Sequence, residues 1–224
     1  MEKEKTGTPG GRQVKKTFPI GTVVLFVIFI VTVVAVTVAV KQLAPRAPDE
    51  LAAVMRPAPR ALQPIAFKDH TGKLYTLADL EGKWTFLFFG YTFCPDICPT
   101  TLSMLSSMIG QLEQDVGSVD DVQVLFVSVD PHRDKPEAIG QYLAHFHQGF
   151  VGITADEPKT RALADQFGAM FFKEQVNDAD NYLMAHASSI YLVGPGADFV
   201  AAFSPPHDPA TIASQFITIR KLKS

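Results

Sequence analysis

Cysteine is scarce in this chain, with two among 224 residues. Two cysteines cannot build a disulfide-rich scaffold or supply the four ligands of a structural zinc site. An excess of positive charge is also missing, because 20 Lys and Arg stand against 23 Asp and Glu, a formal net charge of −3. This balance argues against a nucleic-acid-binding protein, which needs a basic surface. The length fits one globular domain with an appendage, and no internal repeat is found.

One long uncharged run lies near the N-terminus. Residues 20–40 are 21 positions without a charge, interrupted only by one glycine and three threonines. A helix of this length spans the hydrocarbon core of a bilayer, which is about 30 Å thick. A cleaved signal peptide is the alternative, but its apolar region is about 7–15 residues long and ends at a small-residue cleavage site that is missing here. The run therefore predicts an uncleaved membrane anchor.

The charges on the two sides of this run are nearly balanced. Arg12, Lys15 and Lys16 precede it, and four Lys or Arg follow it between residues 41 and 60. The positive-inside rule therefore only leans toward a cytoplasmic N-terminus. Two glutamates among the first four residues argue against a mitochondrial transit peptide, which is poor in acid. We expect a single-pass protein of the bacterial inner membrane with its soluble domain in the periplasm.

The segment after the apolar run is rich in proline. Five prolines fall between residues 44 and 64, a density that resists regular helix or sheet. The chain is therefore divided into a short cytoplasmic segment (1–19), a transmembrane helix (20–40), a proline-rich linker (41–61) and a soluble domain (62–224). From residue 62 onward, 19 Asp and Glu outnumber 11 Lys and Arg, so this domain is acidic.

Apolar runs alternate with helical periodicity along the soluble domain. The continuous runs 84–89 and 122–129 predict buried strands, and the apolar spacing over 100–114 predicts a helix. Further strands are expected within 65–80, 149–154, 188–194 and 198–203, and further helices at 135–146, 158–167 and 209–222. The alternation predicts an α/β domain with a mixed sheet and helices on both faces.

Both cysteines belong to one motif, FCPDICP at residues 93–99, which directly follows a predicted buried strand. Their i, i+4 spacing brings the sulfurs of Cys94 and Cys98 to one face where the loop turns into a helix. A helix N-terminus lowers the pKa of a thiol and favours the thiolate, which binds metals and attacks disulfides. Two inert buried cysteines or a structural disulfide are the alternatives, although the neighbouring prolines and aspartate argue against burial.

Two further residues qualify by their position. His186 stands just before the predicted strand 188–194 and after an irregular acidic stretch, 174–181. If that strand is central, His186 comes near the cysteine loop, although a hydrogen-bonded loop histidine is the more common case. Asp130 follows a predicted strand at the end where α/β proteins place functional groups, and an ordinary turn residue is an equal alternative. The histidines expected to be exposed and without a role are His132, His145, His147 and His207.

Three motifs in this order, FGYTFCPDICPTTL, VSVDPHRDKP and HASSIYLVGP, after one N-terminal span, strongly resemble the Sco/SenC copper chaperones over about residues 60–218. The resemblance implies a thioredoxin-like fold and delivery of copper to the dinuclear copper site of cytochrome c oxidase subunit II, whose cysteines the protein can also reduce. It implies Cys94, Cys98 and His186 as copper ligands, the two cysteines as a redox disulfide pair, and Asp130 as an acidic residue close to the site. A second periplasmic copper chaperone or a thiol–disulfide reductant is a further candidate partner.

The chemistry of this ligand set agrees with the resemblance. Two thiolates and an imidazole suit Cu(I) and hold Cu(II) with added oxygen or nitrogen donors. Three ligands leave a position open for transfer, whereas a structural zinc site is closed by a fourth protein ligand. A thiol–disulfide oxidoreductase is the competing hypothesis, although three residues instead of two separate the cysteines and no proline precedes the strand after His186. A thiol peroxidase would need neither His186 nor the second cysteine. We therefore expect a metallochaperone, with thiol reductase activity as the alternative.

Overall fold

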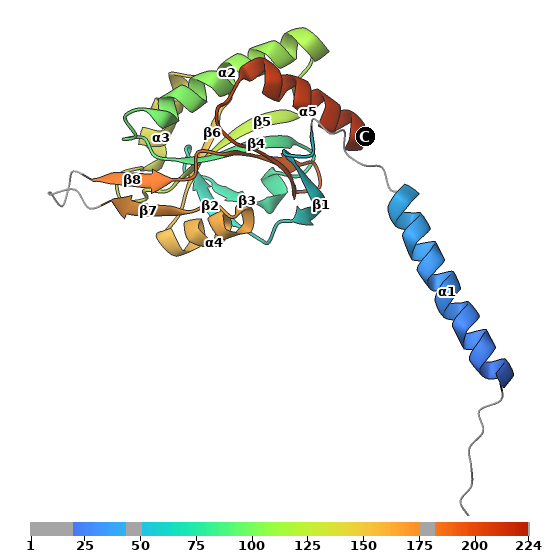
Figure 1. Ribbon diagram of the computed structural model, residues 1–224. Helices are drawn as coiled ribbons and strands as arrows, with labels where there is room; N and C mark the ends of the chain where they lie inside the picture. The colour runs from blue at the N-terminus through green and yellow to red at the C-terminus, as the bar shows by residue number, and fades with distance from the viewer. Residues whose placement is uncertain (1–19, 44–50, 175–181, 224) are drawn as a thin grey trace, which may run out of the picture. The chain divides into compact units, whose positions relative to one another are not determined.

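The computed structural model describes residues 20–43, 51–174 and 182–223, and the chain divides into two units, 1–46 and 47–224 (Figure 1). The described part of the first unit is one helix, α1 (Ile20–Leu43), whose residues 21–39 are all exposed. Among the described residues it is the one helix long and apolar enough to cross a membrane. It lies where the sequence predicts a span, and its intrahelical hydrogen bonds satisfy the backbone as hydrocarbon requires.

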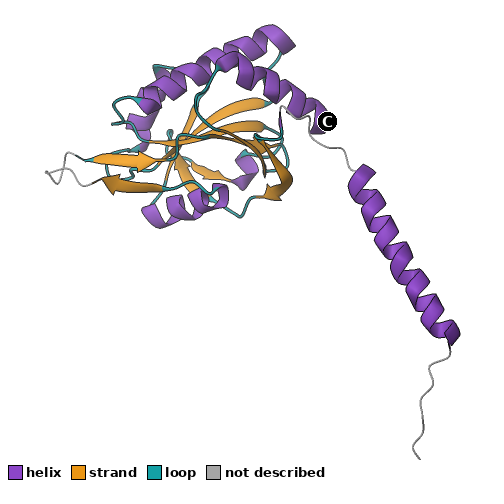
Figure 2. Ribbon diagram, in the orientation of Figure 1, coloured by secondary structure: helices purple, strands orange, loops and turns teal. Residues whose placement is uncertain are grey.

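The second unit is built on an eight-stranded mixed sheet with strand order β1-β10-β9-β4-β5-β6-β2-β3 (Figures 1 and 2). β4, β5 and β6 are parallel, and the remaining neighbours pair antiparallel. The strands of this sheet are β1 (Met55–Ala61), β2 (Ala66–Asp69), β3 (Leu74–Thr76), β4 (Trp84–Gly90), β5 (Val122–Ser128), β6 (Val151–Thr154), β9 (Ile190–Gly194) and β10 (Asp198–Phe203). The predicted mixed sheet is confirmed.

Helices cover both faces of this sheet, as predicted. α2 (Ile97–Val116) and α5 (Pro209–Lys223) lie together on one face, and α4 (Glu157–Phe167) lies on the other (Figure 2). α3 (Pro136–Ala144) packs on β6, and a short 3-10 turn, η2 (Leu77–Asp79), follows β3. α2 buries a stripe at the spacing that predicted it, which includes Leu102, Leu105, Ile109 and Leu112.

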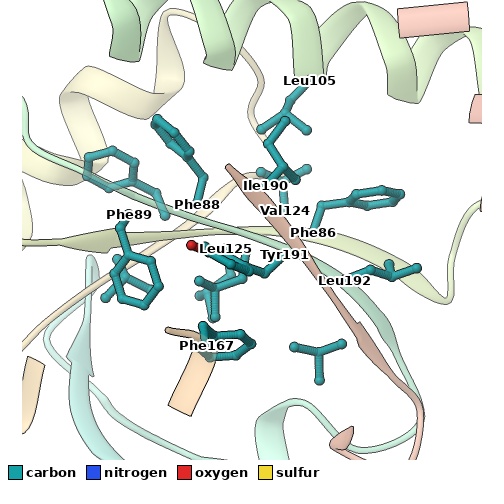
Figure 3. Close-up of a cluster of buried hydrophobic side chains, with 14 of the residues drawn as sticks. Phe86, Phe88, Phe89, Leu105, Val124, Leu125, Phe167, Ile190, Tyr191 and Leu192 are labelled. Carbon is teal, nitrogen blue, oxygen red and sulfur yellow. The ribbon is translucent and has the colours of Figure 1, made fainter. Parts of the chain in front are cut away.

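β4 passes through the middle of the core, and all of its residues are buried. The ring of Phe86 packs on α5, with its centroid 5.1 Å from that of Phe216. Phe89 faces the opposite side of the sheet, where its ring centroid lies 6.0 Å from that of Phe167 on α4 (Figure 3). Because both faces of the strand are covered, its sequence is a continuous apolar run and not an alternating one.

The expectation that proline keeps the segment after the anchor out of sheets is wrong for Met55–Ala61. These residues form β1, an edge strand that pairs antiparallel with β10, and its register shifts between Met55 and Arg60. An edge strand has one side without a ladder, and an irregular register frees further groups, so prolines that lack an N–H donor are tolerated there. Leu51 is fully buried as well, so the packed unit includes residues before position 62. Residues 44–50 lie outside the described part.

A separate two-stranded sheet was not predicted. β7 (Phe171–Glu174) and β8 (Leu183–His186) pair antiparallel, with Phe171 opposite His186 (Figure 1). Residues 175–181, most of the stretch for which an irregular loop was expected, lie outside the described part. His186 therefore ends a strand, and the expectation of a loop histidine is wrong. Pairing with Phe171 fixes the backbone position from which the imidazole extends.

Candidate metal centre

The cysteine motif leaves the sheet at the edge where the parallel strands β4 and β5 end, with Gly90 paired to Ser128. The chain then enters α2, whose N-cap residue is Asp96. The side chain of Asp96 makes no capping hydrogen bond. Instead, the N–H of Cys98 donates to the Sγ of Cys94 over 3.4 Å. Cys94 thus satisfies one of the unpaired donors of the first helical turn, which fixes its sulfur at the positive end of α2.

His186 approaches the same sulfurs from β8. Its Nε2 lies 3.4 Å from the Sγ of Cys98, and its Nδ1 lies 3.1 Å from the carbonyl oxygen of Ala187. Because a carbonyl can only accept, Nδ1 carries the proton and Nε2 presents its lone pair to the sulfur. The rings of Phe88 and Tyr91 contact the imidazole edge-on, with centroids 5.8 Å and 5.9 Å away. Strand pairing, the hydrogen bond and these rings together orient the imidazole as an outer shell orients a metal ligand.

The ligand atoms of Cys94, Cys98 and His186 all lie within 4.8 Å of one another. The structure thus brings together the three residues that the sequence singles out. Among the described residues, they form the one cluster of His, Cys, Asp or Glu side chains that could hold a metal ion. The expectation that the cysteines escape burial is wrong, because Cys98 is fully buried and Cys94 is 9% exposed. Both cysteines are free thiols. Two soft sulfurs and one imidazole nitrogen are donors that suit Cu(I). Three protein donors leave a coordination position open for a ligand from another molecule.

The two thiols hold their protons unequally. The hydrogen bond with Cys98 holds the pKa of the Cys94 thiol well below its ordinary value, and the backbone N–H groups of Asp96 and Cys98 lower it further against the effect of burial. The hydrogen bond with Cys94 raises the pKa of the Cys98 thiol, and burial raises it further. The two shifts favour the thiolate at Cys94 and keep the proton on Cys98.

Asp130 does not belong to the group of ligand atoms. It is buried, and its carboxylate accepts a hydrogen bond from the hydroxyl of Tyr182 over 2.7 Å and pairs with the Nε of Arg133. Arg133 in turn lies over the rings of Tyr91 and Phe93, next to the cysteine loop. The contacts show how Asp130 is held, and its role beside a bound metal stays a prediction.

The sequence reasoning missed two residues that shape the site. Asp134 is fully buried and accepts hydrogen bonds from Ser128 and from both the N–H and the hydroxyl of Thr92. Burial raises its pKa. These bonds tie the start of the cysteine loop to the end of β5. Gly90 is the other, because a Cβ there would come within 2.8 Å of the Sγ of Cys98. Gly90 lies within the motif FGYTFCPDICPTTL and Asp134 within VSVDPHRDKP, but only the contacts made in the fold show what each residue does.

The other histidines divide into two groups. His132 and His145 are exposed as predicted. His147 is half-buried, so the expectation that it is exposed is wrong, and its ring stacks on Phe150. The expectation of an exposed His207 is wrong, because it is half-buried and its Nε2 lies 2.8 Å from the carbonyl oxygen of Ser188, two residues after His186. Among these residues, His145 is the suitable control for substitution of His186.

Comparison with known proteins agrees with this geometry. The SCO1/SenC family model matches residues 54–221, which is most of the chain and all of the site. The chain belongs to the SCO1/SenC family. Among its SCO1/SenC relatives, the mitochondrial SCO1 homolog 1 of Arabidopsis thaliana is 35% identical over 145 residues, 65% of this chain and 42% of the relative. The aligned segment thus spans less than half of that protein.

Solved structures of SCO1/SenC proteins share the fold. The crystal structure of Arabidopsis thaliana ScoI with copper bound is 32% identical, with a TM-score of 0.67 over 71% of this chain and 98% of that one. The structure of Bradyrhizobium japonicum ScoI with copper bound is 31% identical, with a TM-score of 0.62 over 72% and 98%. These likenesses cover the β-sheet unit and establish its thioredoxin-like fold.

Proposed function

We propose that this protein is a membrane-anchored copper chaperone of cytochrome c oxidase assembly. It binds copper through Cys94, Cys98 and His186 and passes the ion to the dinuclear copper site of subunit II. The observation that carries the proposal is the convergence of two sulfurs and an imidazole nitrogen within 4.8 Å at the positive end of α2. Support comes from the two similar structures, which hold copper.

Cys94, Cys98 and His186 have different roles in binding and releasing the copper ion. Cys94 offers a thiolate before copper arrives, and Cys98 loses its proton when copper binds. The fully buried sulfur of Cys98 holds the ion from the protein side, while Cys94 and the half-buried His186 lie toward the surface. An incoming sulfur or nitrogen of the acceptor can therefore occupy the open position before the protein's own ligands leave. Transfer then proceeds by ligand exchange, and free copper is never released.

The anchor and the location complete this proposal. α1 holds the chain in a bacterial inner membrane, with residues 1–19 in the cytoplasm and the copper-binding domain in the periplasm. The apolar composition and length of Gly21–Ala39 support a span. Oxidising conditions in the periplasm make a reductant for the cysteine pair necessary. A second periplasmic copper chaperone or a thiol–disulfide reductant is thus a candidate partner beside subunit II.

A second function, reduction of a partner's disulfide, is favoured by the inequality of the two thiols. Cys94 is a thiolate and the more exposed sulfur, as the attacking cysteine of a reductase must be. Its sulfur would attack the partner's disulfide and form a mixed disulfide. Cys98, after losing its proton, would then attack Cys94 Sγ and release the partner as a dithiol. Two electrons leave the protein, which ends as the Cys94–Cys98 disulfide and can no longer offer two thiolates to copper.

The experiment is a competition between the full-length protein, in detergent, and a Cu(I) chelator. The reduced protein should take one Cu(I), and the protein with an oxidised Cys94–Cys98 pair should take little. His186→Ala should weaken binding about tenfold or more, because it removes one of three donors, whereas the exposed control His145→Ala should bind as the parent does. Near-ultraviolet circular dichroism checks that each variant is folded.

Two results would contradict the proposal. Equal copper retention by His186→Ala and His145→Ala would remove the imidazole from the ligand set. Rapid reduction of insulin by a protein that does not retain copper would favour the reductase over the chaperone.

A further inference from the structure

A groove of about 540 Å³ lies beside the candidate metal centre. Its walls come from the loop after β5, from β7 and from the start of β8, and they include Arg133, Lys173 and Met184. Met184 lies on the strand that ends at His186, and Arg133 lies 4.8 Å from the ring centroid of Phe93, the neighbour of Cys94. A ligand in this groove would therefore lie close to the copper site.

Arg133 has an unused donor in this place. Its guanidinium carbon lies 3.7 Å from the ring centroid of Tyr182, and its Nε pairs with Asp130. Its Nη2 is buried and has no hydrogen-bond partner among the residues that the structure describes. A buried donor without a partner costs free energy, and a guanidinium fork is suited to a carboxylate. The contacts with Tyr182 and Asp130 hold this donor in a fixed direction.

A second cation lies on the same wall. The Nζ of Lys173 is 3.7 Å from the ring centroid of Tyr182, on an exposed residue of β7. No ion pair within residues 51–174 and 182–223 includes Lys173. The ring of Tyr182 thus brings together the charges of Arg133 and Lys173.

The carboxylates that line the groove already have partners. Asp130 is paired with Arg133, and Glu157 is paired with Arg161 at 2.6 Å. The ammonium of Lys173 is thus left at the groove without a carboxylate partner among the described residues. This unpaired ammonium and the unused Nη2 donor of Arg133 both favour an anionic ligand.

The residues around the groove favour a protein over a small anion as its ligand. Phe93 is 58% exposed and Ile97 is 39% exposed, and both belong to the cysteine motif. Exposed apolar side chains beside an aromatic–arginine cluster are typical of the centre of a protein interface. A small anion would leave them in water, whereas a protein segment would cover them.

We propose that the groove receives an acidic side chain of the protein that exchanges copper with this chain, with its carboxylate on the Nη2 of Arg133 and the Nζ of Lys173. The inference rests on the proposed function, because docking at this place is useful only if copper passes between the two proteins. Arg133 contacts Phe93 beside Cys94 and Tyr182 beside β8, which carries His186. A partner held here would therefore present its own ligands next to the bound copper.

The test uses the reduced, copper-free full-length protein in detergent and a fluorescein-labelled hexaglutamate peptide, with binding measured by fluorescence anisotropy at low salt. Lys173→Gln should weaken binding about tenfold, the loss expected for one hydrogen bond to a charged group. Arg133→Lys, which keeps the charge and removes the Nη2 donor, should weaken it to a similar degree. Lys83 is exposed and directly precedes β4, so it lies at the end of that strand opposite to the cysteine motif. The control Lys83→Gln removes one positive charge there and should leave binding within twofold of the parent.

Three results would overturn the inference. Equal weakening by Lys173→Gln and Lys83→Gln would show attraction to net charge alone. Displacement of the peptide by acetate or phosphate at the same concentration of anionic groups would show a small-anion site. Failure of the parent to bind the peptide while it still binds Cu(I) would remove the groove from the mechanism and leave the chaperone function intact. Failure to bind Cu(I) would instead contradict the proposed function itself.

Discussion

Gly90 is the residue at which a single methyl group should disturb the metal centre most directly. It ends β4, and a Cβ placed there would lie 2.8 Å from the Sγ of Cys98, 2.8 Å from a ring carbon of Phe126 and 3.1 Å from one of Phe88. Non-bonded carbons ordinarily stay about 3.5–4.0 Å apart. In Gly90→Ala, the sulfur of Cys98 and the ring of Phe126 must therefore move away by roughly 0.7–1.2 Å.

The expected cost has two parts. Overpacking a filled core costs about 1–3 kcal/mol of unfolding free energy. A ligand sulfur that moves by more than about 0.2 Å no longer fits the metal geometry. The Cu(I) affinity of Gly90→Ala should therefore fall about tenfold or more, equivalent to roughly 1.4 kcal/mol. Urea denaturation measures the first part, and competition with a Cu(I) chelator measures the second.

Gly110→Ala is the matched control on the same helix as Cys98. Nothing lies within 4 Å of a Cβ at Gly110, and alanine favours a helix over glycine by about 0.5–1 kcal/mol. This variant should be slightly more stable than the parent and should bind copper equally well. If Gly90→Ala keeps both the stability and the copper affinity of the parent, Cys98 does not occupy the position that this reasoning requires.

Three further predictions concern the thiols and the core. Cu(I) binding should strengthen with rising pH, about tenfold per unit between roughly pH 6 and 8, because binding displaces the proton that Cys98 holds through its raised pKa; a flat profile would contradict this. Iodoacetamide at about pH 6 should alkylate Cys94 well before Cys98, since Cys94 is the thiolate and the more exposed sulfur; mass spectrometry that finds equal labelling would refute the unequal pair. Phe216→Ala should lower the unfolding free energy by about 3–5 kcal/mol, because its ring is fully buried between Trp84 and Phe86, whereas the exposed Leu222→Ala should change it by less than about 0.5 kcal/mol; urea denaturation distinguishes the two.

The local pattern of the sequence determined much of the fold. Continuous apolar runs identified β4 and β5 because strands covered on both faces need apolar side chains at every position. Apolar spacing identified α2, but its start at Ile97 was placed three residues late, because the sulfur of Cys94 acts as the acceptor for the first turn. Proline was overinterpreted at β1, since a rule about the interior of a sheet does not hold at an edge.

The sequence singled out the three residues of the candidate site but did not predict how they are arranged. The motif around Cys94 and Cys98 fixed two donors, since four residues of chain keep two side chains close wherever the helix lies. His186 is 88 residues from Cys98, and only the pairing of β8 with β7 and the packing of that hairpin bring its Nε2 to the sulfur. Buried cysteines, the closeness of Gly90 and the orphaned donor of Arg133 likewise depend on contacts between distant segments. Spacing along the chain sets which groups can meet, whereas tertiary packing alone decides their distance, their burial and the proton that each one holds.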